Sequence, residues 1–170
     1  MPVLEILTTP DPRLNVKAEP VADIESVQPL IDDMLETMYS TSNGVGLASI
    51  QVGRKEAIVV IDISEERDEP MVLINPVVVS GEGKALGQEG CLSVPEYYAD
   101  VERYTSVVVT ALDRTGEPLT IENDEFLAIV LQHEIDHLQG NLFIDYLSPL
   151  KRQMAMKKVK KAVKAQAKQR

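Results

Sequence analysis

The pentapeptide His-Glu-Ile-Asp-His at residues 133–137 holds both histidines of this 170-residue chain, and it limits the possible fold more than any other segment. Apolar residues between 126 and 131 recur three and four positions apart, which predicts a helix that Asn123 or Asp124 caps and Gly140 ends. Because this helix is apolar on several sides, it belongs in a core, where two buried histidines need polar partners. The rest of the fold must therefore close around residues 133–137.

The spacing of the two histidines suits a metal site. Residues four apart lie on one face of a helix, so His133 and His137 can bind a single ion. Glu134 would then flank that ion, where a carboxylate can take a proton from the attacking water and pass it to a leaving group. The same spacing could belong to two hydrogen-bonded core histidines without a metal, because short motifs also occur by chance.

The position of a third ligand separates the enzyme classes, because two ligands do not hold a catalytic metal. A metzincin would have a histidine where this chain has Phe143. A thermolysin-like enzyme would use a downstream glutamate, but none follows Glu134. We therefore expect the third ligand upstream of the helix.

The upstream candidate is Cys91, the only cysteine in the chain. A lone cysteine is usually a small buried hydrophobic residue. Here Gly87, Gly90 and Pro95 surround it, and they predict a shaped loop rather than a continuous strand. A thiolate and two imidazoles would leave the fourth coordination position open for water.

Three motifs of the chain resemble those of the bacterial peptide deformylases and occur in the same order. They are Gly44-Val45-Gly46-Leu47-Ala48-Ser49-Ile50-Gln51, Glu89-Gly90-Cys91-Leu92-Ser93 and His133-Glu134-Ile135-Asp136-His137. The resemblance extends to the chain length, the order of elements and residues 145–150. It therefore covers nearly the whole chain.

The resemblance implies a metal-dependent hydrolase that removes the formyl group from the initiator methionine of nascent polypeptides and releases formate. It implies one divalent metal ion on Cys91, His133 and His137, with Glu134 as general base and acid. The physiological metal would be Fe2+, although the order of affinities favours Zn2+, and Zn2+, Ni2+ or Co2+ could replace it.

The resemblance also implies roles around the substrate. Gln51 and the backbone N–H of Leu92 would stabilise the oxyanion. The peptide would bind as an added strand along Val45, Gly46 and Gly90. The chain departs from the family's usual residues at Ser49, Gly87 and Tyr98, which puts side-chain preference in question but leaves the reaction unchanged.

The remaining pattern predicts one α+β domain, with a mainly antiparallel sheet packed around the metal-binding helix and a C-terminal helix. Residues 1–23 read as an extended arm, residues 26–40 as a helix with a core-facing stripe, and 57–63, 71–79, 105–112 and 118–121 as strands. Residues 1–150 would form the catalytic domain, which residues 151–170 extend.

The charge of the chain is unevenly divided. Residues 151–170 hold nine Lys or Arg and no acid, whereas residues 1–150 hold eight basic and all 27 acidic residues, for a charge of −19. Such a body should avoid DNA, but the tail could seek phosphate. The tail has no helix breaker and places Met156, Val159 and Val163 on one face. The resemblance implies that it docks on the ribosome; alternatively, it only packs on the body.

The chain shows no basic and apolar leader and no stretch near the ~20 apolar residues that span a bilayer. We therefore expect a cytoplasmic protein without a membrane partner, and a monomer. Two other function classes remain open: a metalloprotease or aminopeptidase with the same motif, and a ribosome- or RNA-binding protein with a structural metal. The latter would need a fourth protein ligand, and only a carboxylate could supply it.

Overall fold

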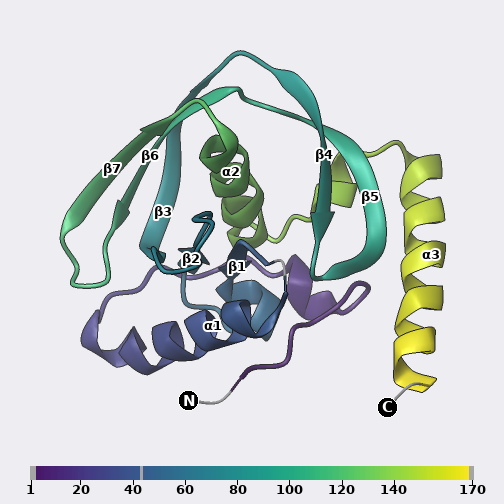
Figure 1. Ribbon diagram of the computed structural model, residues 1–170, viewed down its shortest axis with the longest axis horizontal. Coiled ribbons are helices and arrows are strands. Elements are labelled where there is room, and N and C mark those ends of the chain that lie inside the picture. Colours follow the sequence, from purple (N-terminus) through teal and green to yellow (C-terminus); the bar gives the residue numbers. More distant parts are fainter. Residues whose placement is uncertain (1–2, 43, 169–170) are drawn as a thin grey trace.

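The computed structural model describes residues 3–42 and 44–168. Two antiparallel sheets enclose helix α2 (Phe126–Leu138), as Figure 1 shows. The larger sheet has the order β1-β2-β3-β6-β7, with strands β1 (Gly46–Ala48), β2 (Ile58–Ile61), β3 (Met71–Glu82), β6 (Ser106–Leu112) and β7 (Pro118–Asn123). The smaller sheet is the hairpin of β4 (Ala85–Cys91) and β5 (Val94–Arg103). The expected α+β class, with antiparallel sheet around the central helix, is confirmed.

Helix α2 ends where its sequence predicts, but Glu125 rather than Asn123 or Asp124 occupies the N-cap position. The side-chain oxygen of Asn123 accepts hydrogen bonds from the N–H groups of Glu125 and Ala128, at 2.8 and 3.0 Å. These contacts satisfy N–H groups that a helix start leaves without partners. After Leu138, Gly140 takes a left-handed φ of 83°, and its N–H bonds the carbonyl of His137. Local hydrogen bonds therefore stabilise both ends of the helix, in addition to its packing in the core.

Strand β2 joins two parts of the core. Its four residues are fully buried, and successive side chains of a strand point to opposite faces. Ile58 and Val60 belong to the cluster around helix α1 (Gln28–Ser40), whereas Val59 and Ile61 belong to the cluster around α2. The large sheet is thus covered by α1 on one face and by α2 on the other.

Helix α3 (Pro149–Lys168) lies against β5 at the edge of the molecule (Figure 1). Ala155 and Val159 are fully buried there, in a cluster with Val94, Val101 and Phe143. The expected C-terminal helix is confirmed, although residues 169 and 170 lie outside the described part of the chain. No helix of the described residues is both long enough and apolar enough to cross a membrane.

Two expectations for strands were wrong. Residues 87–95, expected as a loop, lie largely in the β4–β5 hairpin, which pairs from Ala85 with Arg103 to Cys91 with Val94. Strand β4 has little apolar pattern, so it is held mainly by pairing with β5, whose Val94 and Val101 pack in the core. Strand β1 was not expected either, because three residues are too short for a periodic pattern.

Candidate active site

Three potential metal ligands meet where the tip of the β4–β5 hairpin faces α2. Cys91 is the last residue of β4, and His133 and His137 lie one turn apart on α2. One ligand atom from each residue lies within 4.8 Å of the others, and Cys91 Sγ is 3.4 Å from His137 Nε2. This group contains no fourth donor among the described residues. A thiolate and two imidazoles fit a divalent transition metal with an open coordination position.

A buried network of charges holds His133. Its Nδ1 donates a hydrogen bond to Glu89 Oε1 at 2.9 Å, which leaves Nε2 free to bind a metal. Arg103 contacts both oxygens of Glu89, at 2.8 and 2.9 Å, and reaches Asp136 at 2.5 Å. Burial alone would raise the pKa of Glu89, but hydrogen bonds from Arg103 and His133 lower it to about 2. Glu89 is therefore an anion that fixes the tautomer of His133.

This network was not predicted from the sequence. Glu89 and Asp136 stand inside two of the motifs, and this position is the only sequence signal for them. Nothing in the sequence marked Arg103. Glu89 and Arg103 are only 7% and 6% exposed, so each charge needs the other.

His137 is held differently from His133. Its Nδ1 is buried, and it has no hydrogen-bond partner among the described residues. Burial keeps the pKa of His137 well below its ordinary value. The ring is therefore neutral, as a metal ligand must be.

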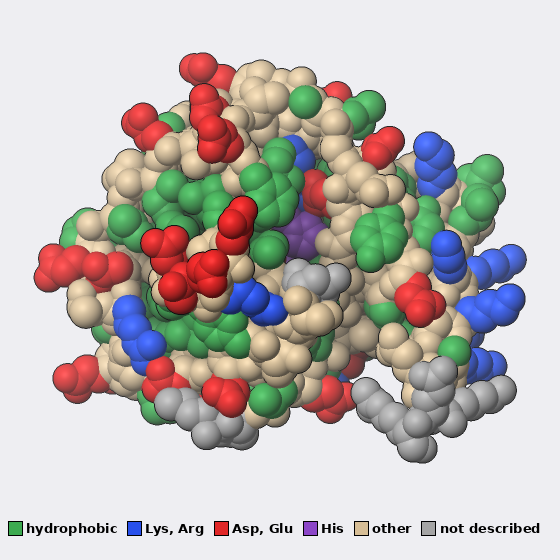
Figure 2. All heavy atoms as spheres, in the orientation of Figure 1, with side chains coloured by type: hydrophobic (Ala, Val, Ile, Leu, Met, Phe, Trp, Pro, Cys, Tyr) green, Lys and Arg blue, Asp and Glu red, His purple; other side chains and the backbone are tan. Residues whose placement is uncertain are grey.

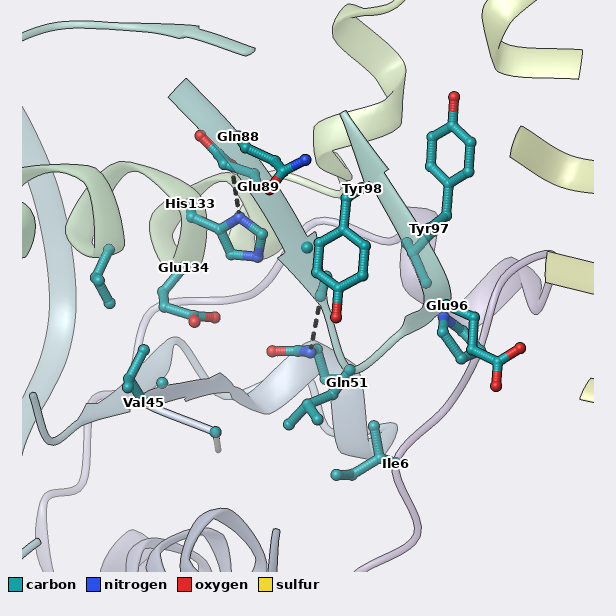
Figure 3. Close-up of a pocket in the computed structure, with 18 of the residues that line it drawn as sticks. Ile6, Val45, Gln51, Gln88, Glu89, Glu96, Tyr97, Tyr98, His133 and Glu134 are labelled. Atoms are coloured by element: carbon teal, nitrogen blue, oxygen red, sulfur yellow. Dashed lines mark hydrogen bonds and ion pairs between the residues drawn. The ribbon is translucent and has the colours of Figure 1, made fainter. Parts of the chain in front are cut away.

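Glu134 lies between His133 and strand β1, with its side chain at the cavity (Figure 3). It is 4% exposed, and its Oε1 is buried without a hydrogen-bond partner in the described residues. Burial raises its pKa to about 7. A Cβ at Gly46 would lie 2.4 Å from Glu134 Oε2, so only glycine leaves room for this carboxylate. The position suits a proton acceptor beside the metal ligands.

Gln51 reaches the site from the short helix after β1. Its Oε1 accepts a hydrogen bond from the N–H of Ala48 at 2.9 Å, which fixes the orientation of the amide. Its Nε2 then points toward Ser93 Oγ at 3.1 Å and Cys91 Sγ at 3.6 Å. Leu92, the other expected donor, lies in the turn between β4 and β5 and lines the cavity.

The expected substrate residues line one cavity of about 580 Å³, a volume within the range of pockets that bind small-molecule ligands. In Figure 2, a histidine is visible at the bottom of this hollow. Val45 and Gly46 line one side and Gly90 lines another, with Phe126, Ile129 and Tyr98 adding apolar surface.

Of the three unusual residues, only Tyr98 reaches the cavity. Its ring lies on Gly90, where an added Cβ would come within 2.5 Å of the ring. Ser49 is fully buried, and its hydroxyl donates to the carbonyl of Glu56. Gly87 pairs with Val101 in the hairpin and does not line the cavity.

Comparison with known proteins agrees with this geometry. The family model described as polypeptide deformylase matches residues 3–153. Peptide deformylase 2 of Vibrio parahaemolyticus is 79% identical over 168 residues, which cover 99% of this chain and 100% of that protein. Peptide deformylase 2 of Vibrio cholerae is 74% identical over 98% of this chain and 99% of that protein.

The solved structure of a peptide deformylase from Legionella pneumophila has a TM-score of 0.93 at 48% identity, covering 98% of each chain. The family match over residues 3–153 includes both sheets and the Cys91, His133 and His137 group. The activity expected from the three motifs is thereby confirmed: this chain belongs to the polypeptide deformylase family and is a metal-binding hydrolase with peptide deformylase activity.

Proposed function

We propose that the enzyme acts on N-formylmethionyl peptides of nascent chains and releases formate from the initiator methionine. The observation that carries this proposal is the buried Glu134 carboxylate beside a Cys/His/His group at an open cavity. The cavity admits a side chain of methionine size, and a formyl group would meet the three ligands.

Cys91, His133 and His137 would hold one divalent metal, with Fe2+ as the physiological ion and Zn2+, Ni2+ or Co2+ as substitutes. Such an ion, when bound, supplies a Lewis acid that makes water a nucleophile at neutral pH. The thiolate of Cys91 suits a soft metal, but it also makes an iron enzyme sensitive to oxygen.

Glu134 would act as general base and then as general acid. Its Oε1, which has no partner among the described residues, would accept the proton of the attacking water. The same oxygen would deliver that proton to the nitrogen of methionine as the formamide bond breaks. The absence of a side chain at Gly46 leaves room for the carboxylate at this position.

Two donors would stabilise the oxyanion that develops on the formyl oxygen. One is the Nε2–H of Gln51, which faces Cys91 Sγ, and the other is the backbone N–H of Leu92. A donor of this kind contributes ~3 kcal/mol to the transition state.

The peptide would add to the free edge of β1. Strand β1 ends the larger sheet and pairs only with β2 among the described strands, so its other edge is open. Val45 precedes this strand and Gly46 is its first residue, whereas Gly90 lies across the cavity. A peptide bound there gains main-chain hydrogen bonds, and its first side chain enters the cavity.

We also propose that α3 docks the enzyme, a monomer of the cytoplasm, on the ribosome, and that residues 151–170 extend the domain of residues 1–150. Blue side chains gather over α3 in Figure 2. Lys157, Lys158, Lys160, Lys161 and Lys164 are exposed, whereas the apolar face of α3 packs on β5. The body carries a charge of −19, so this face is the one that RNA would attract.

The test of docking leaves the apolar face of α3 intact. Replacing these five lysines by glutamine should reduce co-sedimentation with ribosomes at low salt and leave hydrolysis of a short formyl-peptide unchanged. Binding by the unmodified enzyme should weaken steeply with added salt, because each neutralised phosphate releases counterions. If the glutamine variant pellets as well as the unmodified enzyme, α3 only packs on the body.

The test of the reaction compares formyl-Met-Ala-Ser with Met-Ala-Ser, using protein purified without oxygen. We expect formate from the first peptide, no free methionine from the second, and about one divalent metal ion per chain. Release of methionine from Met-Ala-Ser would instead identify an aminopeptidase. Metal analysis of the same sample decides between iron and zinc.

A further inference from the structure

The guanidinium of Arg67 lies outside the cavity and binds four backbone carbonyl groups. Its Nη1 donates to the carbonyl oxygens of Thr41 at 2.9 Å and Ser42 at 3.0 Å. Its Nη2 donates to those of Met38 at 3.2 Å and Gly44 at 3.3 Å. Met38 lies in the last turn of α1, where carbonyl groups without helical partners carry a partial negative charge that a cation stabilises. One side chain thus holds the end of α1 and the segment that leads to β1.

Arg67 is itself fixed from two sides. Its backbone has a φ of 55°, in the left-handed region that few residues other than glycine adopt. Its guanidinium carbon lies 5.5 Å from the centre of the Tyr39 ring, a cation–π contact. The Tyr39 hydroxyl donates to Asp62 at 2.5 Å, and Asp62 also accepts the N–H groups of Ser64 and Glu69, at 2.9 and 3.1 Å. Asp62 therefore ties together the two ends of the loop that carries Arg67 and links it to Tyr39 of α1.

The same loop also holds the start of the active-site strand. The N–H of Asp62 donates to the carbonyl of Val45 at 2.8 Å. Strand β1 has only three residues, so its own ladder gives it little independent stability. Gly46 lies against the Glu134 carboxylate, so a small shift of this backbone changes the wall of the cavity.

We propose that Arg67 is a positioning residue that sets the affinity for the peptide backbone without touching the substrate. This proposal rests on the proposed function, in which the peptide lies along Val45 and Gly46. Arginine suits the task because its planar fork presents five donors, enough for four carbonyl groups at once. Lysine would present a point charge with three donors on a flexible stem and would hold the segment less well.

Two variants separate the contribution of the guanidinium group from the contributions of its charge and of the left-handed backbone. Arg67→Lys keeps the charge, and Arg67→Gly keeps the left-handed φ without strain but removes the guanidinium. In both variants, the KM for formyl-Met-Ala-Ser should rise about tenfold, as expected for one or two lost hydrogen bonds. The KM for formyl-methionine, which extends less far along β1, should rise by less than about threefold on the same basis. The kcat and the metal content should stay close to those of the unmodified enzyme.

The matched control is Arg54→Lys, because Arg54 is half-exposed and its ion pair is with Glu56. It should leave both KM values unchanged. Amide hydrogen exchange at residues 45–48 should quicken in both Arg67 variants, whether or not any substrate is hydrolysed. This measurement tests Arg67 even if the unmodified enzyme releases no formate, an outcome that would overturn the proposed function alone.

Three outcomes would overturn the role of Arg67. One is unchanged hydrogen exchange at residues 45–48 in both variants. Another is an equal rise in KM for the two substrates, which would place the effect in the methionine cavity. The third is a decrease in kcat and metal content in proportion to a decrease in Tm, with KM unchanged. A residue needed only for stability would produce this result.

Discussion

The two walls of the active site are held by different kinds of interaction. The wall that carries Cys91 is backed by buried charges, since Glu89 and Arg103 form ion pairs behind His133 at 7% and 6% exposure. The wall that carries Val45 and Gly46 is an edge strand that pairs with β2, and backbone carbonyl groups at and before its start accept hydrogen bonds from a surface loop. The first arrangement resists displacement because separating buried charges is strongly unfavourable.

This difference suggests that the two walls affect different steps, metal binding and the binding or turnover of substrate. Changes in the Cys91 wall should alter metal binding and kcat. Changes in the β1 wall should leave the metal in place and alter substrate binding or the rate of the chemical step. The following substitutions test this division, from the largest expected effect to the smallest.

Cys91→Ala should give the largest effect, with loss of both the bound metal and the activity. Removal of the thiolate leaves two imidazoles, which do not hold a catalytic metal. Cys91→Ser and Cys91→Asp should be intermediate or inactive, because harder oxygen ligands change the affinity for the metal. Elemental analysis and formate release measure the two properties. Full metal content with unchanged activity would remove Cys91 from the ligand set.

Glu134→Ala should keep the metal and lower kcat by ~10²–10⁴-fold, the range for a general acid–base group. The carboxylate lies between the two walls and touches Gly46 rather than joining the ligand group. Metal analysis beside the rate measurement is therefore the deciding comparison. Loss of the metal together with the rate would show that Glu134 is a ligand.

Gln51→Leu changes the β1 wall and should lower kcat by ~10²–10³-fold while the metal content stays constant. The substitution removes a donor near Cys91 Sγ and also the contact with the N–H of Ala48. Thermal unfolding serves as the control for the second loss. A drop in metal content would mean that the two walls are not independent.

Glu89→Gln should have the smallest effect of the four, a 10- to 100-fold weaker affinity for metal, as is typical when an outer hydrogen-bond partner is changed. The amide can still accept from His133 Nδ1 but no longer matches the charge of Arg103. Competition with a chelator measures the affinity. Once loaded with metal, the variant should keep the KM of the unmodified enzyme, because the β1 wall is untouched.

The sequence predicted the helices and most strands because these elements repeat apolar residues at a regular spacing. The helix with His133 and His137 and the tail helix were both found in this way. The hairpin around Cys91 was missed, because it is stabilised by the pairing of segments with little apolar pattern. Strand β1 is too short to show any pattern.

The candidate ligands were predictable because a helix places His133 and His137 together, and because one cysteine remained. Their outer partners were not. Arg103 stands 14 residues from Glu89 and 33 from Asp136, and the three meet only through the fold. Arg67 is likewise unremarkable in the sequence, since its four acceptors are backbone groups that carry no sequence signature.

The close approach of Gly46 to Glu134 has a consequence for inhibitors of the enzyme and for resistance to them. Any side chain at position 46 would collide with the carboxylate. We therefore expect substitutions at this position to disable the enzyme's own base. An inhibitor that binds the main chain of residue 46, rather than the side chain of Tyr98, would therefore depend on a position where we expect substitutions to cost the enzyme its activity.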